Sequence, residues 1–496
     1  MTDDIFSLAD LRAIEKTAEQ AGLDLMQKAA DSATHWVVQH YPNDCAILVA
    51  AGTGHNGGDA LWVAYQLAQL AYPVTLFVPE TPKSVATQKA LLACLDEGVL
   101  VIKDASDLNV SFSLLIDGLF GIGLNRILSS TWQAIIRQIN SLQIPILSLD
   151  VPSGLDAWCG SVYGEAIRAN TTLTFLCAKP GLHTAEGPDY AGQVMVDRLD
   201  LPATMRPIPC GTLLPPSAHS LARKMNSHKG QYGTVCVVGG AIGMVGAALL
   251  AGRAAISAGA GKVYVGLIEP ILYDPLMPDL MIQNAQAIHQ LEADVYVVGP
   301  GLSCTDQAYQ VLRPLLDQPS KKVIDADALN LIAQHPQLAK AVFAQPDTCI
   351  LTPHPMEAAR LLNTSVDKVQ SDRVAASKKL AQQFCATVVL KGCGTVIARN
   401  DGFFRINTSG NAALSVAGQG DVLAGICGAL LAQGMPIFEA ASLGVYVHGL
   451  VANHWQNIHQ GTIGLSASQT ILLIANELNR LIAKNLSGVR KQRHFL

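Results

Sequence analysis

Short apolar runs that alternate with longer helix-like stretches recur along the chain and limit its fold more than any other feature. These runs occupy residues 46–50, 74–78, 114–116, 146–149, 235–238, 263–266, 295–298, 323–324, 349–351 and 388–390. Strands that alternate with helices predict a mostly parallel sheet covered by helices on both faces. Because ligands bind beyond the carboxyl ends of such strands, we expect an α/β protein whose site residues follow these runs.

The alternation fails once, between about residues 199 and 220. Five prolines crowd this segment, namely Pro202, Pro207, Pro209, Pro215 and Pro216. The chain has 496 residues, whereas a single core stops growing at about 250 to 300 residues. We therefore predict two α/β domains, residues 1–212 and 213–496, with the linker in this proline-rich region.

Composition narrows the class of protein. Half of the residues are hydrophobic and 15% are charged, which excludes a disordered chain. The formal net charge of −5 provides no basic field for a nucleic-acid polymer or an anionic membrane. Eleven cysteines without a CxxC pair fit a reducing compartment. No signal peptide or bilayer-spanning stretch is evident, so we expect a soluble, cytoplasmic protein.

A glycine-rich segment follows the first apolar run. Residues 52–59 read Gly-Thr-Gly-His-Asn-Gly-Gly-Asp and precede an apolar helical pattern from Ala60, an order typical of phosphate-binding sites. The glycines also satisfy GxGxxG, and Glu80 lies some twenty residues later. An NAD-dependent Rossmann dehydrogenase is therefore one interpretation, and a glycine turn that serves only packing is another.

Two further polar segments follow apolar runs. Residues 117–126 read Asp-Gly-Leu-Phe-Gly-Ile-Gly-Leu-Asn-Arg, and residues 150–155 read Asp-Val-Pro-Ser-Gly-Leu. In a parallel sheet, Asn56, Asp117, Asp150 and Ser153 are expected to meet at one edge. There they offer oxygen ligands to a monovalent cation, or groups for proton transfer. Each aspartate taken alone is equally compatible with a helix cap.

These segments together resemble the NAD(P)H-hydrate epimerase domain over roughly residues 1–215, which implies a Rossmann-like fold. The substrate-binding residues that the resemblance implies are His55, Asn56, Gly57, Gly58, Asp59, Gly121, Ile122, Gly123, Leu124, Asn125, Arg126, Ile127 and Asp150. It further implies that Asn56, Asp117 and Ser153 bind K⁺. Asp150 is our candidate acid/base for the epimerisation. The chain departs from the family pattern at His55, where Asn is usual, and at Ala60, where Gly is common.

The second half begins with another glycine-rich segment. Residues 239–247 read Gly-Gly-Ala-Ile-Gly-Met-Val-Gly-Ala and lead into a small-residue helical pattern at 248–258, which allows close approach of the backbone to a ligand. A Walker A loop is the competing interpretation. We reject it because Val263 follows Lys262, where that motif requires Ser or Thr.

A glycine turn at residues 417–420 brings Asp421 to the start of an apolar helical pattern. Backbone amides at a helix start stabilise anionic oxygen, and an adjacent carboxylate is suited to take a proton from a hydroxyl. Phosphoryl transfer needs this combination. A simple helix cap remains the alternative.

Four more segments support a catalytic interpretation: residues 299–302, 325–330, 352–357 and 391–395. With the glycine turn they resemble the ribokinase-like NAD(P)H-hydrate dehydratase over roughly residues 220–485. The hydrate-binding residues that the resemblance implies are Ala247, Gly301, His354 and Asp421, and the nucleotide-binding residues are Lys391, Gly392, Cys393, Gly394, Thr395 and Gly420. The chain keeps Gly418, Gly420 and Asp421 of the family's GGxGD and has Met356 for the glycine of HPGE.

The resemblance implies a reaction in which Asp421 is the base, the hydrate's hydroxyl is phosphorylated, and phosphate then leaves. ADP is the implied co-substrate, giving AMP and phosphate. Asp325 and Asp327 are candidates to order Mg²⁺ near the phosphates, or to cap the next helix. His354 is alternatively a structural histidine, and Lys391 a solvated lysine at a strand end.

Both resemblances together predict repair of hydrated NADH and NADPH. The first domain is expected to interconvert the R and S hydrates and the second to dehydrate the S hydrate; we also expect a homo-oligomer. Two alternatives stay open. One is a ribokinase-like kinase of a vitamin precursor fused to a nucleotide-binding domain, and the other is a nucleotide sensor with degenerate sites.

Overall fold

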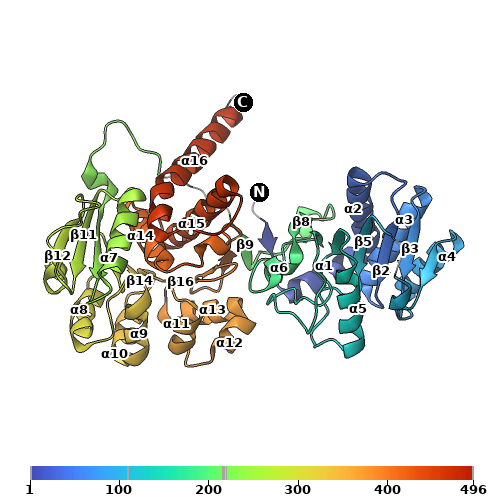
Figure 1. Cartoon of the computed structure of the whole chain (residues 1–496), viewed down its shortest axis with the longest axis horizontal. Helices are drawn as coiled ribbons and strands as arrows, with labels where there is room; N and C mark the ends of the chain where they lie inside the picture. Colours follow the sequence, from blue (N-terminus) through green and yellow to red (C-terminus); the bar gives the residue numbers. More distant parts are fainter. Residues whose placement is uncertain (1–2, 109–110, 215–217, 219–220, 494–496) are drawn as a thin grey trace. The chain divides into compact units, whose positions relative to one another are not determined.

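The computed structural model describes residues 3–108, 111–214, 218 and 221–493. The chain divides into two compact units, Met1–Thr212 and Leu213–Leu496 (Figure 1). Of the predicted linker, Pro215 and Pro216 lie outside the described residues. Its described part includes a 3₁₀ turn at Ala203–Met205 and strand β9 (Gly211–Leu213).

The first unit is a seven-stranded sheet with the order β4-β3-β2-β5-β6-β7-β8, and every neighbouring pair runs parallel. Its strands are β2 (Ile47–Ala51), β3 (Val74–Phe77), β4 (Leu100–Ile102), β5 (Leu114–Gly118), β6 (Ile146–Leu149), β7 (Thr171–Phe175) and β8 (Gln193–Asp197). Its helices are α1 (Leu8–Gln20), α2 (Leu25–His40), α3 (His55–Gln69), α4 (Val85–Asp96), α5 (Ser130–Ser141) and α6 (Gly187–Ala191). A short strand β1 (Asp4–Ile5) pairs antiparallel with β9.

Strand β2 shows why this sheet is covered on both faces. Side chains of a strand alternate between the faces, and all five residues of β2 are buried. Ile47 and Val49 belong to a core that includes Leu61 of α3, whereas Leu48 belongs to a separate core that includes Ile136 of α5. A continuous apolar run therefore forms a strand between two helix layers.

The second unit has the strand order β18-β17-β16-β15-β14-β13-β10-β11-β12. The pairs from β16 to β12 are parallel, and β17 and β18 extend the sheet antiparallel. Its strands are β10 (Thr234–Gly239), β11 (Lys262–Leu267), β12 (Met281–Asn284), β13 (Val295–Val298), β14 (Lys321–Ile324), β15 (Cys349–Leu351), β16 (Thr387–Leu390), β17 (Val396–Ala398) and β18 (Phe404–Ile406).

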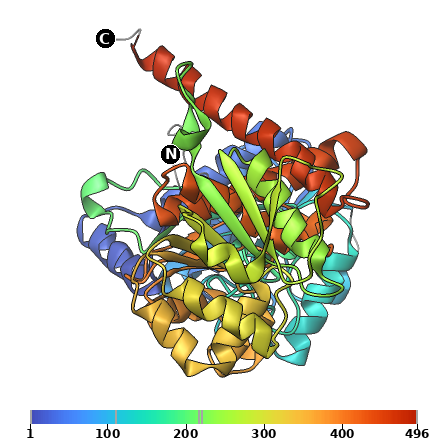
Figure 2. The same ribbon diagram turned by 90° about the vertical axis from the view of Figure 1, so that its left-hand side faces the viewer.

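Helices cover both faces of this sheet. They are α7 (Val245–Ser257), α8 (Asp306–Leu316), α9 (Ala326–Gln334), α10 (Pro336–Phe343), α11 (Pro355–Leu361), α12 (Val366–Ser371), α13 (Arg373–Phe384), α14 (Gln419–Ala432), α15 (Ile437–His459) and α16 (Ala467–Arg493). Helices α8 to α13 lie on one face and α7 with α14 to α16 on the other (Figure 1). Figure 2 shows the same two layers from the side of β11 and β12. The predicted α/β architecture is confirmed in both units.

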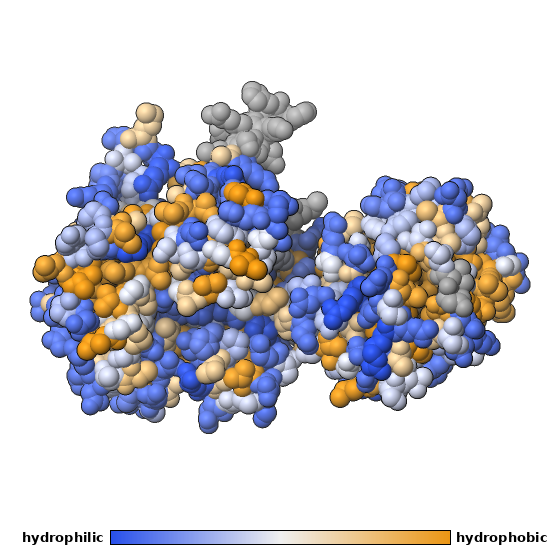
Figure 3. Space-filling model, viewed as in Figure 1, coloured by the Kyte–Doolittle hydropathy of each residue, from blue (hydrophilic) through white to orange (hydrophobic). Residues whose placement is uncertain are grey.

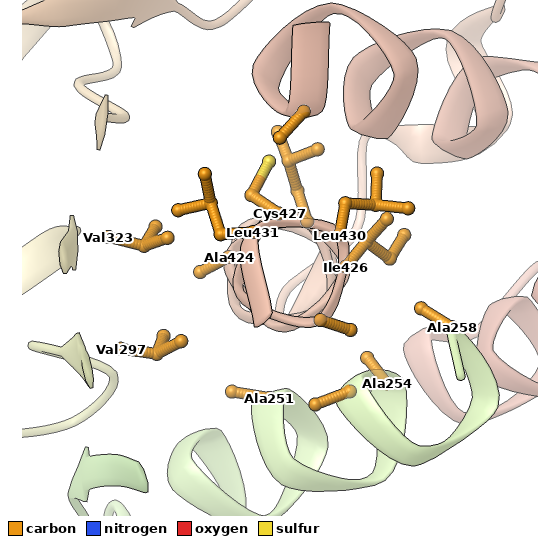
Figure 4. Close-up of a cluster of buried hydrophobic side chains, with 14 of the residues drawn as sticks. Ala251, Ala254, Ala258, Val297, Val323, Ala424, Ile426, Cys427, Leu430 and Leu431 are labelled. Carbon is orange, nitrogen blue, oxygen red and sulfur yellow. The ribbon is translucent and has the colours of Figure 1, made fainter. Parts of the chain in front are cut away.

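Helix α14, which carries Asp421, is buried along most of its length. Ala251 and Ala254 of α7 lie against one side of it, and Val297 and Val323 of the sheet lie against another (Figure 4). Small residues on α7 allow a close approach: a Cβ on Gly425 would lie 2.1 Å from the Ala251 carbonyl oxygen. The packing therefore fixes the position at which α14 begins.

We expect Gly425→Ala to lower the free energy of unfolding of the second unit by about 1 to 3 kcal/mol, because the added methyl group overlaps backbone. Gly246→Ala is the matched control, since Gly246 lies in α7 with nothing within 4 Å of its added Cβ. Urea unfolding of both variants measures the difference. Equal midpoints would show that α7 and α14 tolerate a wider separation.

No helix within the described residues is both long and apolar enough to cross a membrane. The face of the molecule in Figure 3 mixes hydrophilic and hydrophobic residues over both units.

Candidate functional site

Helix α3 begins at His55, with Gly54 as its N-cap. The sequence analysis placed residues 52–59 before the helix, which is wrong: Asn56 to Asp59 lie in its first turns. Tight backbone contacts explain the glycines. A Cβ on Gly52 would lie 1.8 Å from the Leu119 carbonyl oxygen, and one on Gly57 would lie 2.0 Å from that of Gly52. The start of α3 is therefore pressed against the segment that follows β5.

Asn56, Asp117 and Ser153 meet at the carboxyl edge of the first sheet, as predicted. Asn56 Nδ2 donates to the carbonyl oxygens of Phe120, at 2.8 Å, and Leu149, at 3.1 Å. Its amide is thereby oriented. Asn56 Oδ1 is buried and has no hydrogen-bond partner among the described residues. An oxygen held in this way is left available to a ligand that the protein itself does not supply.

Asp117 is fully buried and accepts four hydrogen bonds. Ser153 donates from its hydroxyl at 2.6 Å and from its backbone at 2.9 Å, Ser148 donates from its hydroxyl at 2.8 Å, and the Leu119 backbone donates at 3.2 Å. Burial raises the pKa of Asp117, and these donors oppose the rise. Asp117 thus ties the segments after β5 and β6 together, which a simple helix cap does not do.

Asp150 lies at the end of β6 in the left-handed region of the backbone, with φ of 61°. Three donors converge on its Oδ1: Lys179 Nζ at 2.7 Å, Thr174 Oγ1 at 3.2 Å and the Phe175 backbone at 3.3 Å. No hydrogen bond to Oδ2 is found among the described residues. A non-glycine residue at positive φ is strained, and such strain concentrates at functional sites.

Acidic groups on α1 and α3 share this environment. Desolvation and the charge of Asp150 raise the pKa of Asp59 well above its ordinary value. Desolvation also raises the pKa of Glu15, against the lowering effect of His55. His55 itself is exposed at the start of α3. His55 and Asp59 therefore border the same side as Asp150, as the predicted site requires.

Only part of the predicted loop 121–127 contacts the residues of this site. A Cβ on Gly121 would lie 3.1 Å from Asn56 Cβ, so this residue contacts the start of α3. Ile122 and Leu124 are half-buried. Gly123, Asn125, Arg126 and Ile127 are exposed, with Ile127 at 72%. A contact between those four residues and a ligand remains a prediction.

At the second site, Gly418 is the N-cap of α14 with φ of 86°, and Asp421 is the third residue of the helix. Positive φ favours glycine at this turn. Lys391, after β16, lies beside it: a Cβ on Gly420 would be 3.3 Å from Lys391 Nζ. Asp421 and Lys391 are thus brought together from segments 30 residues apart in the chain.

Asp325 anchors Lys391. It is the N-cap residue of α9, but its side chain makes no capping bond. Its Oδ1 instead accepts from Lys391 Nζ and from Thr352 Oγ1, each at 2.7 Å. Asp327 Oδ2 accepts from the Ser303 backbone at 2.8 Å. The structure therefore favours a site role over a capping role for Asp325, and Lys391 is a half-buried lysine in an ion pair with a buried carboxylate rather than a solvated lysine.

His354 is the N-cap of α11 and forms a capping box with Glu357. Its Nδ1 accepts from the Met356 and Glu357 backbone amides, and Glu357 accepts from the His354 backbone at 2.8 Å. The histidine thus bonds nearby backbone, as one interpretation predicted. Its side chain is nevertheless 45% exposed, so it remains accessible to a ligand. Burial and Lys391 lower its pKa.

Three carboxyl groups surround the Lys391 ammonium group. Glu357 lies 3.9 Å from Lys391 Nζ, and desolvation raises its pKa to about 7. Desolvation, followed by the charge of Asp325, raises the pKa of Asp421 to about 7, while Lys391 lowers it. A carboxylate with a pKa near neutrality is suited to act as a general base at physiological pH.

The remaining predicted residues lie at the start of α7 and in two loops. Gly301 has φ of 60°, and its added Cβ would lie 3.2 Å from Ala247 Cβ, so these two predicted hydrate contacts adjoin. Gly392 has φ of 132° and packs against the buried Arg373 guanidinium group. Cys393 is exposed in the next position. Thr395 Oγ1 donates to the Gly392 carbonyl oxygen at 3.0 Å, closing this turn.

Several residues at these sites escaped the sequence analysis. They are Thr174 and Lys179 beside Asp150, and Arg373 beside the Lys391 loop. Thr352 and Glu357 belong to the segment 352–357, which the sequence analysis named without giving these two residues a role. One signal was visible for Lys179, because a lone cation follows the apolar residues 175–178. The others come from segments whose proximity depends on strand order.

Comparison with known proteins also divides the chain into two domains. A family model described as NAD(P)H-hydrate dehydratase matches residues 235–473, and one described as YjeF-related protein N-terminus matches residues 22–181. The bifunctional NAD(P)H-hydrate repair enzyme Nnr of Coxiella burnetii is 34% identical over 473 residues, which covers 90% of this chain and 94% of that protein. The chain belongs to this family. The corresponding enzyme of Escherichia coli is 36% identical, over 90% of this chain and 88% of its own.

Members of this family are bifunctional NAD(P)H-hydrate repair enzymes, and the chain is an enzyme of this kind, with epimerase and dehydratase domains. The predicted α/β fold class is confirmed for both domains, since each is built on a mostly parallel sheet. A Bacillus subtilis ADP/ATP-dependent NAD(P)H-hydrate dehydratase, co-crystallised with ATP and Mg²⁺, is 29% identical with a TM-score of 0.46, covering 52% of this chain and 94% of its own. A ribokinase-like protein of Enterococcus faecalis is 25% identical with a TM-score of 0.49, covering 56% of this chain and 98% of its own.

Proposed function

We propose that the first domain interconverts the R and S hydrates of NADH and NADPH, and that the second dehydrates the S hydrate with ADP, releasing AMP and phosphate. The observation that carries this proposal is the position of the Asp421 carboxyl group in the first turn of α14, next to the ion pair of Lys391 and Asp325, where burial raises its pKa to about 7. A base there serves a hydroxyl group, and hydrates differ from NADH and NADPH by the elements of water.

In the first domain, Asp150 is the proposed acid/base. Inverting a carbon that bears a hydroxyl group requires one bond to break and to re-form on the other face, with a proton moving to or from the departing group. A carboxylate with one oxygen fixed and the other open is suited to move that proton. His55 to Asp59 and Gly121 to Ile127 are the proposed substrate contacts.

The residues around Asn56 fit the implied K⁺ ion. Asn56 Oδ1 is a buried oxygen without a partner, and Asp117 and Ser153 add carboxylate and hydroxyl oxygens nearby. Within the described residues no group of three or more His, Cys, Asp or Glu side chains forms a metal cluster. Amide, hydroxyl and carboxylate oxygens are hard ligands. When bound, K⁺ would supply positive charge for substrate phosphate.

In the second domain, Asp421 is proposed to take the proton of the hydrate's hydroxyl group as this oxygen accepts a phosphoryl group. The amides at the start of α14 favour anionic oxygen in this position. Lys391 and the turn 392–395, with Gly420, are the proposed nucleotide contacts, and Ala247, Gly301 and His354 hold the hydrate. Phosphate then leaves with that oxygen, and the neighbouring ring carbon loses a proton, which together restore the double bond of the dihydropyridine.

Asp325 and Asp327 fit a role beside Mg²⁺. In nucleotide enzymes this ion is held by one or two carboxylates together with substrate phosphates. Asp325 uses Oδ1 for Lys391 and Thr352, while its Oδ2 would lie 3.8 Å from a Cβ on Gly420, and so faces the start of α14. When bound, Mg²⁺ would neutralise phosphate charge there.

The function is tested by supplying hydrated NADH with ADP or with ATP. Recovery of absorbance at the dihydronicotinamide band, with one phosphate released per turnover, is the expected result. Faster recovery with ADP than with ATP supports the proposed co-substrate. A stable phosphorylated product without NADH would instead identify a kinase.

We expect the kcat/KM of dehydration to rise with pH to a plateau, with half of the plateau reached near pH 7. The sign follows because the base must be ionised, and the pKa of Asp421 is raised from 3.8 to about 7. Glu357→Gln removes a neighbouring negative charge that contributes to this rise, so its profile should move to lower pH. A profile that moves to higher pH would contradict this assignment.

A further inference from the structure

Lys179 is a buried cation that the proposed epimerase chemistry leaves unexplained. Its side chain is 4% exposed, and a buried ammonium group is costly unless it is paired. Nζ contacts Asp150 Oδ1 at 2.7 Å and donates to the Phe175 carbonyl oxygen. Lys179 therefore forms its ion pair with the carboxyl group that is proposed to move the proton, while the Phe175 carbonyl oxygen accepts a second hydrogen bond from the same ammonium group.

The backbone around Lys179 is held rigidly. Lys179 is the N-cap residue of the 3₁₀ turn Pro180–Leu182, all of whose residues are buried. A Cβ on Gly181 would lie 2.0 Å from the Asp156 carbonyl oxygen. Proline fixes its own φ, and the glycine allows a close backbone contact that another residue would not. The turn after β7 therefore fixes the backbone from which the Lys179 side chain extends, and the contacts with Asp150 and the Phe175 carbonyl oxygen hold Nζ.

The hydrogen-bond donors around Asp150 all contact one of its two carboxylate oxygens. Lys179, Thr174 and the Phe175 backbone all donate to Oδ1, and Oδ2 has no hydrogen bond within the described residues. An ion pair that served stability alone would gain from satisfying both oxygens. This arrangement instead fixes the carboxyl group through one oxygen and leaves the other for a reactant.

The charges of Asp150 and Lys179 also shift the pKa values of neighbouring side chains. Desolvation raises the pKa of Glu15. The charge of Asp150 raises it further, and the charge of Lys179 lowers it. The buried Cys177 thiol, between the two in sequence, has its pKa raised by burial, while Lys179 lowers it. Asp59 adds a further acidic group facing Asp150. Lys179 thus lies among several acidic groups, and Arg12 also lowers the pKa of Glu15.

We infer that Lys179 is a positioning residue for epimerisation: it fixes the Asp150 carboxyl group through Oδ1, so that Oδ2 meets the hydrated ring. This inference rests on the proposed function of Asp150. Lys179 acts through Asp150 and makes no contact with the substrate. Its removal should therefore change kcat and leave KM near the wild-type value.

The test follows interconversion of the R and S hydrates by the full chain, with the epimers separated by chromatography. We expect Lys179→Ala to lower kcat about 100-fold, the effect of misplacing a reacting group by roughly 1 Å. Methylammonium should restore much of the rate, whereas tetramethylammonium, a cation without an N–H donor, should not. Lys28→Ala is the matched control, because Lys28 makes an ion pair with Asp200 at the surface.

Thr174→Val provides a second variant in case Lys179→Ala does not fold. It removes another donor to Oδ1 at nearly constant volume, so a smaller fall in kcat with unchanged KM is expected. Dehydration of the S hydrate reports the integrity of each preparation. The inference is overturned if both variants keep the wild-type kcat, or if KM alone changes, or if methylammonium has no effect on a folded Lys179→Ala protein. Absence of epimerisation by the wild-type chain would instead overturn the proposed function itself.

Discussion

Asp421→Asn is expected to lower the rate of dehydration by about 10²- to 10⁴-fold, the usual contribution of a general base. The amide keeps the shape of the side chain but cannot accept the proton of the hydroxyl group. Binding of the adenine nucleotide should persist, because Lys391 and its Asp325 partner are unchanged. The measurement is NADH recovery from the S hydrate, with nucleotide affinity determined by calorimetry.

The matched control is Asp306→Asn, which changes an aspartate in the first turn of α8. It should dehydrate at the wild-type rate. Measuring the thermal stability of Asp421→Asn distinguishes a loss of catalysis from a loss of folding. Since the pKa of Asp421 is raised to about 7, the folded protein binds its proton more tightly than the unfolded chain, and the stability from this group falls as pH rises from about 4 to 7. Asp421→Asn removes that cost, so its Tm at pH 8 should not be lower. An active variant would refute the role of Asp421.

Asp150→Asn is expected to lower the rate of epimerisation by about 10²- to 10⁴-fold while dehydration of the S hydrate continues. The reason is that an amide cannot exchange a proton at the position of Oδ2. With mixed hydrates as the starting material, this variant should consume the S epimer and leave R. Chromatography of the residual hydrates measures the outcome, after correction for spontaneous interconversion.

Asp200→Asn is the control for replacing an aspartate whose backbone has a positive φ. Asp200 also has positive φ, 49°, but makes only a surface ion pair with Lys28. It should retain both activities. Consumption of both epimers by Asp150→Asn at the wild-type rate would show that another group carries the proton, or that the second domain accepts both hydrates.

Much of each site was readable from motifs. The predicted meeting of Asn56, Asp117 and Ser153 is found, because parallel strands bring their carboxyl ends to one edge. The segment 146–149 was predicted with its correct bounds, since a buried parallel strand is continuously apolar. Strand β7 was missed because three of its five residues are threonine, which weakens the apolar signal even though the strand is buried within the sheet.

The start of α3 shows where local reasoning fails. Glycines 54, 57 and 58 predict a turn because glycine disfavours helix, yet they lie at the cap and in the first turns of α3. The Gly52 backbone leaves no room for a side chain at residue 57, and the end of the Met26 side chain lies against residue 58. Tertiary packing therefore outweighed local propensity.

The sequence by itself determined the α/β class, the family and the two motif aspartates, Asp150 and Asp421, because apolar periodicity and glycine turns are local properties of the chain. Only the tertiary structure decided what surrounds those aspartates. Lys179 reaches Asp150 because β7 lies beside β6, and Lys391 reaches Asp325 because β14, β15 and β16 are neighbours. Strand order and burial are set by the packing of the whole sheet, and burial is what raises the pKa of Asp421.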